Sequence, residues 1–168
     1  MKKVLMPFFI VLIAIGIIIT LFLSLAQQEH LLVVHEGNIE HKVIDFKPNT
    51  YQCPECKMPI ETLVFAAEAV LPNGKTFFFD DPGCLVLWLE DKEHKDEITL
   101  WIHTLDTQKW IHAGAASFSL TDNTPMLYGF GAYEMHKKGM IDFETMRLKM
   151  LRGENMTDPY IRKKLLGN

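Results

Sequence analysis

The amino-acid sequence predicts an α+β fold in which hairpins of a mainly antiparallel sheet pack with helices, preceded by one N-terminal transmembrane helix. Three observations lead to this prediction: a long uncharged run at the N-terminus, pairs of β-rich segments joined by turn residues, and apolar helical segments that begin at capping residues. The order of hairpin, helix and further hairpin also suggests two halves of ββαβ type, although no internal sequence repeat supports that division.

The N-terminal run, Val4–Ala26, has 23 residues and no charge. A helix of this length matches the hydrocarbon core of a bilayer, about 30 Å thick, whereas the apolar region of a signal peptide usually has about 7–15 residues. We therefore expect residues 1–27 to remain as a membrane anchor. Because Lys2 and Lys3 precede the run and no similar basic cluster follows it, we expect a single-pass protein of the cytoplasmic (inner) membrane. Its C-terminal domain should face the periplasm or the outside.

Residues 28–49 are expected to join the anchor to the folded domain as a linker and a short edge segment. Two apolar stretches in it, residues 31–34 and 43–46, have the composition of short strands. The main domain, with the metal-binding motif, is expected over residues 50–152. A C-terminal helical extension follows over residues 153–168.

The first expected hairpin pairs Leu63–Leu71 with Thr76–Asp80. Asn73-Gly74 between them is the strongest short-range signal for a hairpin turn. Asp81 and Pro82 then match the N-cap and the first position of a helix, because aspartate accepts hydrogen bonds from free backbone N–H groups and proline has none to leave unpaired. This helix is expected to continue through the sequence LVLWLEDKE.

Further strands are expected later in the chain, at Ile98–Leu105, Trp110–Leu120 and Met126–Tyr133. A polar turn separates the first two of them. From Ile141 the apolar residues follow a helical spacing. Gly153 is placed to end that helix, since glycine readily adopts the left-handed conformation that is common after a helix.

The charge balance argues against nucleic acid as a partner. The chain has 17 Lys and Arg against 21 Asp and Glu, a formal net charge of −4. Without the two lysines of the expected anchor, 15 basic residues face 21 acidic ones, which gives −6. Proteins that bind nucleic acid usually present a basic surface. No catalytic triad order, phosphate-binding glycine loop or carboxylate pair is recognisable, so we expect a binding protein and not an enzyme.

Three sulfur-bearing residues, Cys53, Cys56 and Met58, lie within six positions of a chain that has three cysteines in all. Outside the cytoplasm an unoccupied cysteine pair tends to become a disulfide. The residues leave three chemistries open. A zinc site would need both cysteines, Cys84 and a histidine. A thiol–disulfide centre would use Cys53 and Cys56, and a soft-metal site would combine thiolate with the Met58 thioether.

The soft-metal interpretation is favoured, because a thioether suits Cu(I) and is a poor ligand for zinc. Cys56 and Met58 stand two positions apart, which in an extended stretch places both side chains on one side of the chain. The thiol–disulfide interpretation lacks the βαβ frame that accompanies such a pair in thioredoxin-like folds. For Cys53 three roles stay open: ligand, resolving thiol or structural residue.

The chain also resembles the NosL family, the copper-binding accessory proteins of nitrous oxide reductase. Three segments carry the resemblance in the family's order: CPECKMPI at 53–60, AVLPNGKTFFFDDPGC at 69–84, and NTPM at 123–126 with YGFGA after it. The resemblance covers about residues 50–135. It implies Cu(I) as the bound metal and delivery of copper for assembly of the enzyme's copper–sulfide cluster. The implied partners are nitrous oxide reductase and its membrane-bound maturation machinery.

Carried over by position, the resemblance implies Cys56 and Met58 as copper ligands, with Met126 as a third and Cys53 as a further candidate. Two departures from the family stand out. Many members have glycine where this chain has Lys57, and many are lipoproteins, whereas this chain has an apolar run and no lipid-accepting cysteine. Neither departure removes a donor. The alternative function is that of a membrane-tethered thiol–disulfide protein that uses Cys53 and Cys56.

Several other polar residues receive structural roles. Cys84 lies in an apolar helical stretch and is expected to be a packing cysteine. Asp80 and Asp81 are expected to end a strand and to cap a helix. None of the seven histidines stands out as a ligand, although imidazole suits copper and one of them could complete the site.

Overall fold

The structure, a computed structural model, describes residues 11–21 and 31–167. The chain divides into two units, Met1–His30 and Leu31–Asn168. In the first unit residues 11–21 are helical. No helix within the described residues is both long and apolar enough to cross a bilayer, and much of the expected span Val4–Ala26 lies outside those residues.

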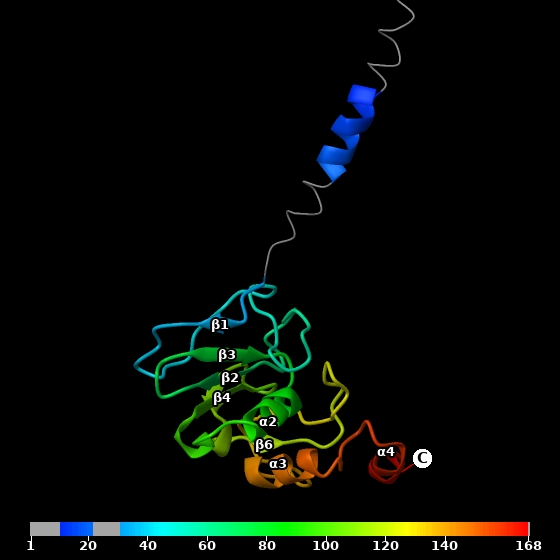
Figure 1. Cartoon of the computed structure of the whole chain (residues 1–168). Coiled ribbons are helices and arrows are strands. Elements are labelled where there is room, and N and C mark those ends of the chain that lie inside the picture. The colour runs from blue at the N-terminus through cyan, green and yellow to red at the C-terminus, as the bar shows by residue number, and fades with distance from the viewer. Residues whose placement is uncertain (1–10, 22–30, 168) are drawn as a thin grey trace, which may run out of the picture. The chain divides into compact units, whose positions relative to one another are not determined.

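A five-stranded antiparallel sheet forms the centre of the second unit (Figure 1). Its strands are β1 (Val34–His35), β2 (Ala67–Val70), β3 (Thr76–Phe79), β4 (Thr99–His103) and β5 (Trp110–His112). Their order across the sheet is β1-β3-β2-β4-β5, and every neighbouring pair is antiparallel. The expected α+β class is therefore confirmed, together with the β2–β3 hairpin and the pairing of β4 with β5.

The turn between β2 and β3 forms where the Asn-Gly signal places it. The Asn73 side chain accepts a hydrogen bond from the backbone N–H of Lys75 at 3.1 Å. Gly74 has a φ of +79°, a conformation that glycine adopts without steric cost. A Cβ atom at Gly74 would lie 2.7 Å from the side chain of Ile39, so the chain before β2 lies directly against this turn.

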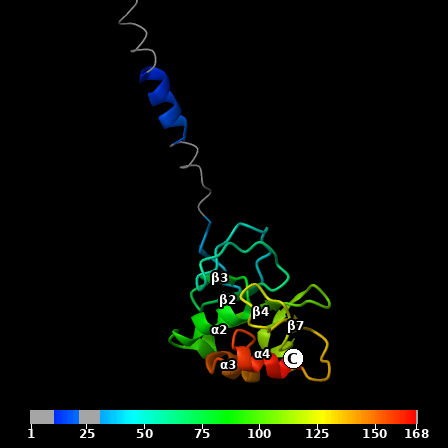
Figure 2. The ribbon, with the colours of Figure 1, turned by 90° about the vertical axis from the view of Figure 1, so that its right-hand side faces the viewer.

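One helix covers a face of the sheet, and a second helix packs beside the first (Figures 1 and 2). α2 (Pro82–Glu90) begins as expected at Asp81, whose carboxylate accepts a hydrogen bond from the N–H of Gly83 at 2.8 Å. α3 (Phe143–Leu151) packs beside α2 and is followed by Gly153, which has a φ of +71°. The main core lies between these helices and the sheet. It includes Phe79, Cys84, Leu85, Ile102, Phe118, Phe130 and Met146.

The opposite face of the sheet is covered by residues 44–63, which form no regular strand or helix. The Tyr51 ring stacks on Phe78 of β3 with 3.9 Å between centroids, and Phe46 meets Phe78 edge-on at 4.8 Å. These aromatic residues and Ile60 are buried in a second core. Part of the segment expected as a linker is thus built into the folded unit.

Glu68 on β2 is a fully buried acidic side chain on this second face. It lies opposite Phe78 on β3 and Trp101 on β4, and its exposed fraction is 0%. One carboxyl oxygen accepts a hydrogen bond from the N–H of Ile44 at 3.2 Å, and the other has no partner among the described residues. Burial raises the pKa of Glu68 to about 8 and the charge of Asp45 adds to the rise, whereas the bond from Ile44 opposes it.

Two of the expected strands are shorter than the sequence suggests. The segment Trp110–Leu120 is interrupted after β5 by a 3-10 helix, Ala113–Ala115, before β6 (Ser117–Phe118) begins. β6 pairs with β7 (Ala132–Tyr133) in a separate two-stranded sheet. No strand forms over residues 43–46 either, and the edge of the large sheet is β1 instead.

Only the end of the expected strand Met126–Tyr133 is a strand. The backbone N–H of Met126 donates to Asp81 at 3.0 Å and that of Tyr128 donates to the Thr124 hydroxyl at 3.1 Å. Because these donors bind side chains, they are not available to a neighbouring strand, and the segment forms a turn.

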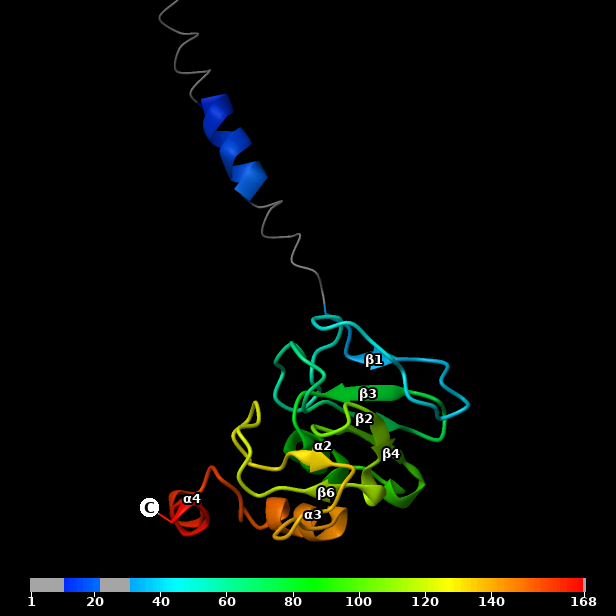
Figure 3. The same cartoon turned by 180° about the vertical axis from the view of Figure 1, so that it is seen from behind.

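The two expected halves differ. β2, β3, α2 and β4 follow the ββαβ order of the first half. The second half begins with β6, β7 and α3, but the next element among the described residues is α4 (Pro159–Leu166), not a strand. α4 occupies the expected C-terminal extension and has no buried residue. It lies at the end of the unit far from β1 (Figure 3).

Candidate metal centre

The motif with Cys53 and Cys56 forms a tight loop that is closed by backbone hydrogen bonds. Gln52 and Pro59 face each other in an isolated antiparallel bridge. Inside it, the N–H of Cys53 donates to the carbonyl of Met58 at 2.9 Å. These backbone hydrogen bonds fix the conformation of the loop of residues 53–58, which carries both cysteines.

The backbone conformation of Lys57 determines how the side chains of Cys56 and Met58 are oriented relative to each other. Its φ is +66°, in the left-handed region, and its N–H donates to the carbonyl of Cys53 at 3.1 Å. The stretch from Cys56 to Met58 is not extended, so the expectation that an extended chain points both side chains to one side is wrong. Glycine, which many NosL proteins carry at this position, adopts such a φ without steric cost.

Four side chains converge at one point beside this loop. The Sγ atoms of Cys53, Cys56 and Cys84 and a carboxylate oxygen of Asp80 all lie within 4.8 Å of one another. Asp80 follows β3 directly, and Cys84 lies in the first turn of α2. Cys53 and Cys84 are 0% exposed and Asp80 is 4% exposed, whereas Cys56 is half-buried. One ion placed between them would reach all four.

Asp80 is a donor that was not expected from the sequence, and Cys84 was expected as one only in the zinc alternative. Cys84 is buried in the main core, as a packing cysteine would be, but its sulfur also belongs to the cluster. Asp81 caps α2 as expected, whereas Asp80 contributes to the cluster besides ending the strand. Asp80 and Cys84 both lie in the segment FFFDDPGC that resembles the NosL family. This shared position in one segment was the sequence feature that could have identified both residues as donors.

Asp80 differs from its neighbour Asp81 in what its carboxylate binds. Asp81 accepts from the N–H groups of Gly83 and Met126 at 2.8 and 3.0 Å. Asp80 accepts from the thiol of Cys56, with S–O distances of 3.3 and 3.4 Å. No ion pair to Asp80 occurs among residues 11–21 and 31–167. A buried carboxylate without a cationic partner is unfavourable, which makes Asp80 a natural ligand for a cation.

The three thiols influence one another's ionisation. A hydrogen bond from Cys84 lowers the pKa of Cys53, against the opposing effect of burial. The same hydrogen bond and burial raise the pKa of Cys84. Burial raises the pKa of Cys56 to about 12. Since the thiols cannot all ionise together unaided, a metal ion is needed to stabilise three thiolates here. The N-terminal end of α2 favours negative charge and so helps to stabilise a thiolate at Cys84.

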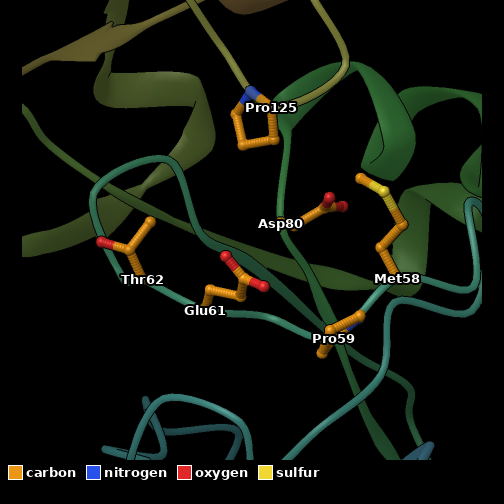
Figure 4. Close-up of a pocket in the computed structure, with 6 residues that line it drawn as sticks. All are labelled: Met58, Pro59, Glu61, Thr62, Asp80 and Pro125. Carbon is orange, nitrogen blue, oxygen red and sulfur yellow. The ribbon is translucent and has the colours of Figure 1, made fainter.

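A pocket opens beside the cluster (Figure 4). It is lined by Met58, Pro59, Glu61, Thr62, Asp80 and Pro125. The thioether end of Met58 and the carboxylate of Asp80 point toward one another in this view. Met58 is 38% exposed, so the pocket connects the buried carboxylate with the solvent.

Two of the four residues predicted as ligands belong to the cluster, and the other two lie outside it. Cys53 and Cys56 belong to the cluster, and Met58 lines the adjoining pocket. Met126 is half-buried against the main core, and its backbone is tied to Asp81 at the start of α2. Ligation by the sulfurs of Met58 and Met126 stays a prediction.

The donor set of three thiols and one carboxylate suits a thiophilic metal ion. The zinc alternative required a histidine, but within the described part of the chain the fourth member of the cluster is Asp80. The thiol–disulfide alternative places the pair at the start of a helix. Here Cys53 and Cys56 lie in a turn, and Cys84 stands at the helix start instead.

Comparisons with known proteins identify no relative of this chain. No protein-family model, no curated protein and no solved structure matches it. The likeness to the NosL family consequently rests on the three sequence segments alone.

Proposed function

We propose that this protein is a membrane-anchored, extracytoplasmic Cu(I)-binding metallochaperone of NosL type. Its cargo would serve the assembly of the copper–sulfide cluster of nitrous oxide reductase, through the membrane-bound maturation machinery of that enzyme. The observation that carries the proposal is the convergence of three cysteine sulfurs beside a pocket lined by Met58. Thiolate and thioether sulfurs are the donors that favour Cu(I).

A chaperone must hold its ion and also release it. Cys53 and Cys84 are 0% exposed and provide the buried side of the centre. Cys56 is half-buried, and Met58, which lines the pocket, is 38% exposed, so these two donors are within reach of an incoming ligand. Copper can pass to a partner by stepwise replacement of these outer donors, while the buried cysteines keep it from the solvent.

A Cu(I) titration of the full chain in mild detergent tests this function. In competition with a Cu(I)-specific chelator we expect about one Cu(I) per chain, with weaker binding after Cys56→Ser and after Met58→Leu. Met135→Leu is the matched control, because Met135 is 65% exposed and does not line the pocket. Zinc that holds the site against equimolar Cu(I) would refute the proposal.

The alternative of a thiol–disulfide protein is less consistent with the burial of the thiols. A redox catalyst exposes the thiol whose pKa is lowered. Here the hydrogen bond from Cys84 lowers the pKa of Cys53, which is 0% exposed, and burial raises the pKa of the more accessible Cys56 to about 12. The Met58→Leu variant separates the two functions, since a dithiol catalyst should be indifferent to Met58.

Membrane anchoring is supported by the uncharged run Val4–Ala26 and by Lys2 and Lys3 before it. An anchor keeps the domain near membrane-bound partners and so raises their effective concentration. Protease added to intact spheroplasts should degrade the domain. A domain that stays protected until the inner membrane is breached would lie in the cytoplasm, and the proposed topology would be wrong.

A further inference from the structure

The cluster contains one donor of a kind that Cu(I) does not prefer, the carboxylate of Asp80. We propose that Cys53, Cys56, Cys84 and Asp80 also bind a divalent thiophilic cation of the Zn(II) class as a four-coordinate site. In this proposal Asp80 is the ligand that decides between the divalent ion and Cu(I). The inference rests on the proposed metal-binding function of the cluster and adds the class of ion that it holds without copper.

The geometry of the four donors fits such a site. Tetrahedral Zn(II) binds thiolate at about 2.3 Å and carboxylate oxygen at about 2.0–2.2 Å, which places its ligand atoms roughly 3.5–3.8 Å apart. The four donor atoms lie within 4.8 Å of one another before any ion is added. Shifts of about 1 Å or less are enough to form the site, and side-chain rotation can supply them.

The charge of the cluster favours a divalent ion as well. Three thiolates and a carboxylate together carry four negative charges, of which a divalent ion offsets two and Cu(I) offsets one. Asp80 is 4% exposed and forms no ion pair within residues 31–167, so little else compensates its charge. Cu(I) prefers sulfur and gains little from carboxylate oxygen, so copper binding leaves Asp80 free.

Asp80 is also available in a way that Asp81 is not. Asp81 is held by two backbone N–H groups and its loss would uncap α2. The hydrogen bond to Asp80 comes from the Cys56 thiol, which gives its proton to the solvent when it becomes a metal ligand. Metal binding thus removes the one donor that holds Asp80 and leaves its oxygen facing the ion. A bound divalent ion would protect the thiols from oxidation until Cu(I) displaces it.

Co(II) is a suitable probe, because it takes the place of Zn(II) and its visible absorption reports tetrahedral thiolate coordination. The full chain, reduced and in mild detergent, is titrated with Co(II) and then with Zn(II) in competition with a chromophoric chelator. We compare the wild type with Asp80→Asn, Asp80→Cys and Asp96→Asn. Asp96 is exposed and belongs neither to the pocket nor to the cluster, so its variant is the matched control.

The wild type and Asp96→Asn should give the same intense tetrahedral Co(II) spectrum. Asp80→Asn should lose at least about tenfold in Co(II) and Zn(II) affinity, since loss of even an outer partner costs 10–100-fold at metal sites. Its Cu(I) affinity should change by less than about threefold. Asp80→Cys should bind Co(II) with a stronger thiolate-to-cobalt absorption, which shows that position 80 enters the coordination sphere and that the variant is folded.

Equal Co(II) affinity and spectra in the wild type, Asp80→Asn and Asp80→Cys would overturn the inference and leave the copper function standing. Tetrahedral Co(II) binding that depends on Asp80, in a protein that takes up no Cu(I), would refute the copper function and leave the divalent-ion site standing. A parallel loss of Cu(I) and Co(II) in Asp80→Asn, with a normal Cu(I) site in Asp80→Cys, would make Asp80 a general structural residue and also contradict its role in selectivity.

Discussion

Glu68 makes the stability of the folded unit depend on pH in a direction that one substitution can isolate. Its side chain is 0% exposed on the face of the sheet opposite α2, and burial raises its pKa to about 8 from its ordinary value of 4.5. Between those two values the folded protein binds a proton that the unfolded chain has released. The stability contributed by Glu68 is therefore fully present below about pH 4.5 and falls as the pH rises toward 8.

The magnitude follows from the same two values. Each pKa unit corresponds to about 1.4 kcal/mol, so the free energy of unfolding should fall by up to about 4–5 kcal/mol between pH 5 and pH 9 on account of Glu68. Glu68→Gln keeps the size of the side chain and an oxygen to accept from Ile44, but it has no proton to lose. Wild type and variant should be about equally stable near pH 5, and the variant several kcal/mol more stable near pH 8.5.

Urea unfolding, followed by tryptophan fluorescence at several pH values, measures this difference. The other titrating groups, such as His103 and the cysteines, are present in both proteins, so their effects cancel when one profile is subtracted from the other. Parallel profiles for the wild type and Glu68→Gln would show that Glu68 ionises in the folded state as it does in the unfolded chain. The account of a buried neutral carboxyl group would then be wrong.

Three further substitutions probe the backbone around the candidate metal centre, each by urea unfolding of the reduced, metal-free protein. Lys57→Gly should raise the free energy of unfolding by about 0.5–1 kcal/mol, because φ is +66° at this residue; a loss of stability would show that the lysine side chain outweighs the strain. Asp81→Ala should lower it by about 2 kcal/mol, since the N-terminus of α2 loses its cap and the N–H of Met126 loses its partner; a change below about 0.5 kcal/mol would contradict that role. Gly83→Ala should cost about 1–3 kcal/mol, because the added Cβ would collide with the Tyr128 ring; unchanged stability would mean that the ring moves aside freely.

The parts of the fold that the sequence predicts well are those with local causes. The β2–β3 turn follows from Asn73-Gly74, and the start of α2 follows from the cap at Asp81. β6 and β7 are two residues long and carry no alternating pattern that could mark them. Residues 44–63 cover one face of the sheet because Phe46 and Tyr51 contact Phe78 of β3. These contacts join residues far apart in the sequence, so no local pattern predicts them.

The candidate centre divides in the same way. The spacing of Cys53 and Cys56 identifies a sulfur site, because both residues belong to one short loop. Cys84 and Asp80 join it through the placement of that loop over the start of α2, which is a tertiary contact. The direction of Met58 depends on the φ of one residue, Lys57, which a lysine gives no reason to expect. Sequence reasoning could therefore predict that Cys53 and Cys56 lie together, but not that Asp80 and Cys84 join them.

The cluster is assembled from three segments: the loop of residues 53–58, the end of β3 and the first turn of α2. Its donors meet only after β3 has paired with β2 and the aromatic contacts of Tyr51 have drawn the loop onto the sheet. An unfolded chain thus does not hold these four donors together. In the proposed function, metal loading therefore follows folding, and a copy that binds an ion through all four donors has this part of its fold in place.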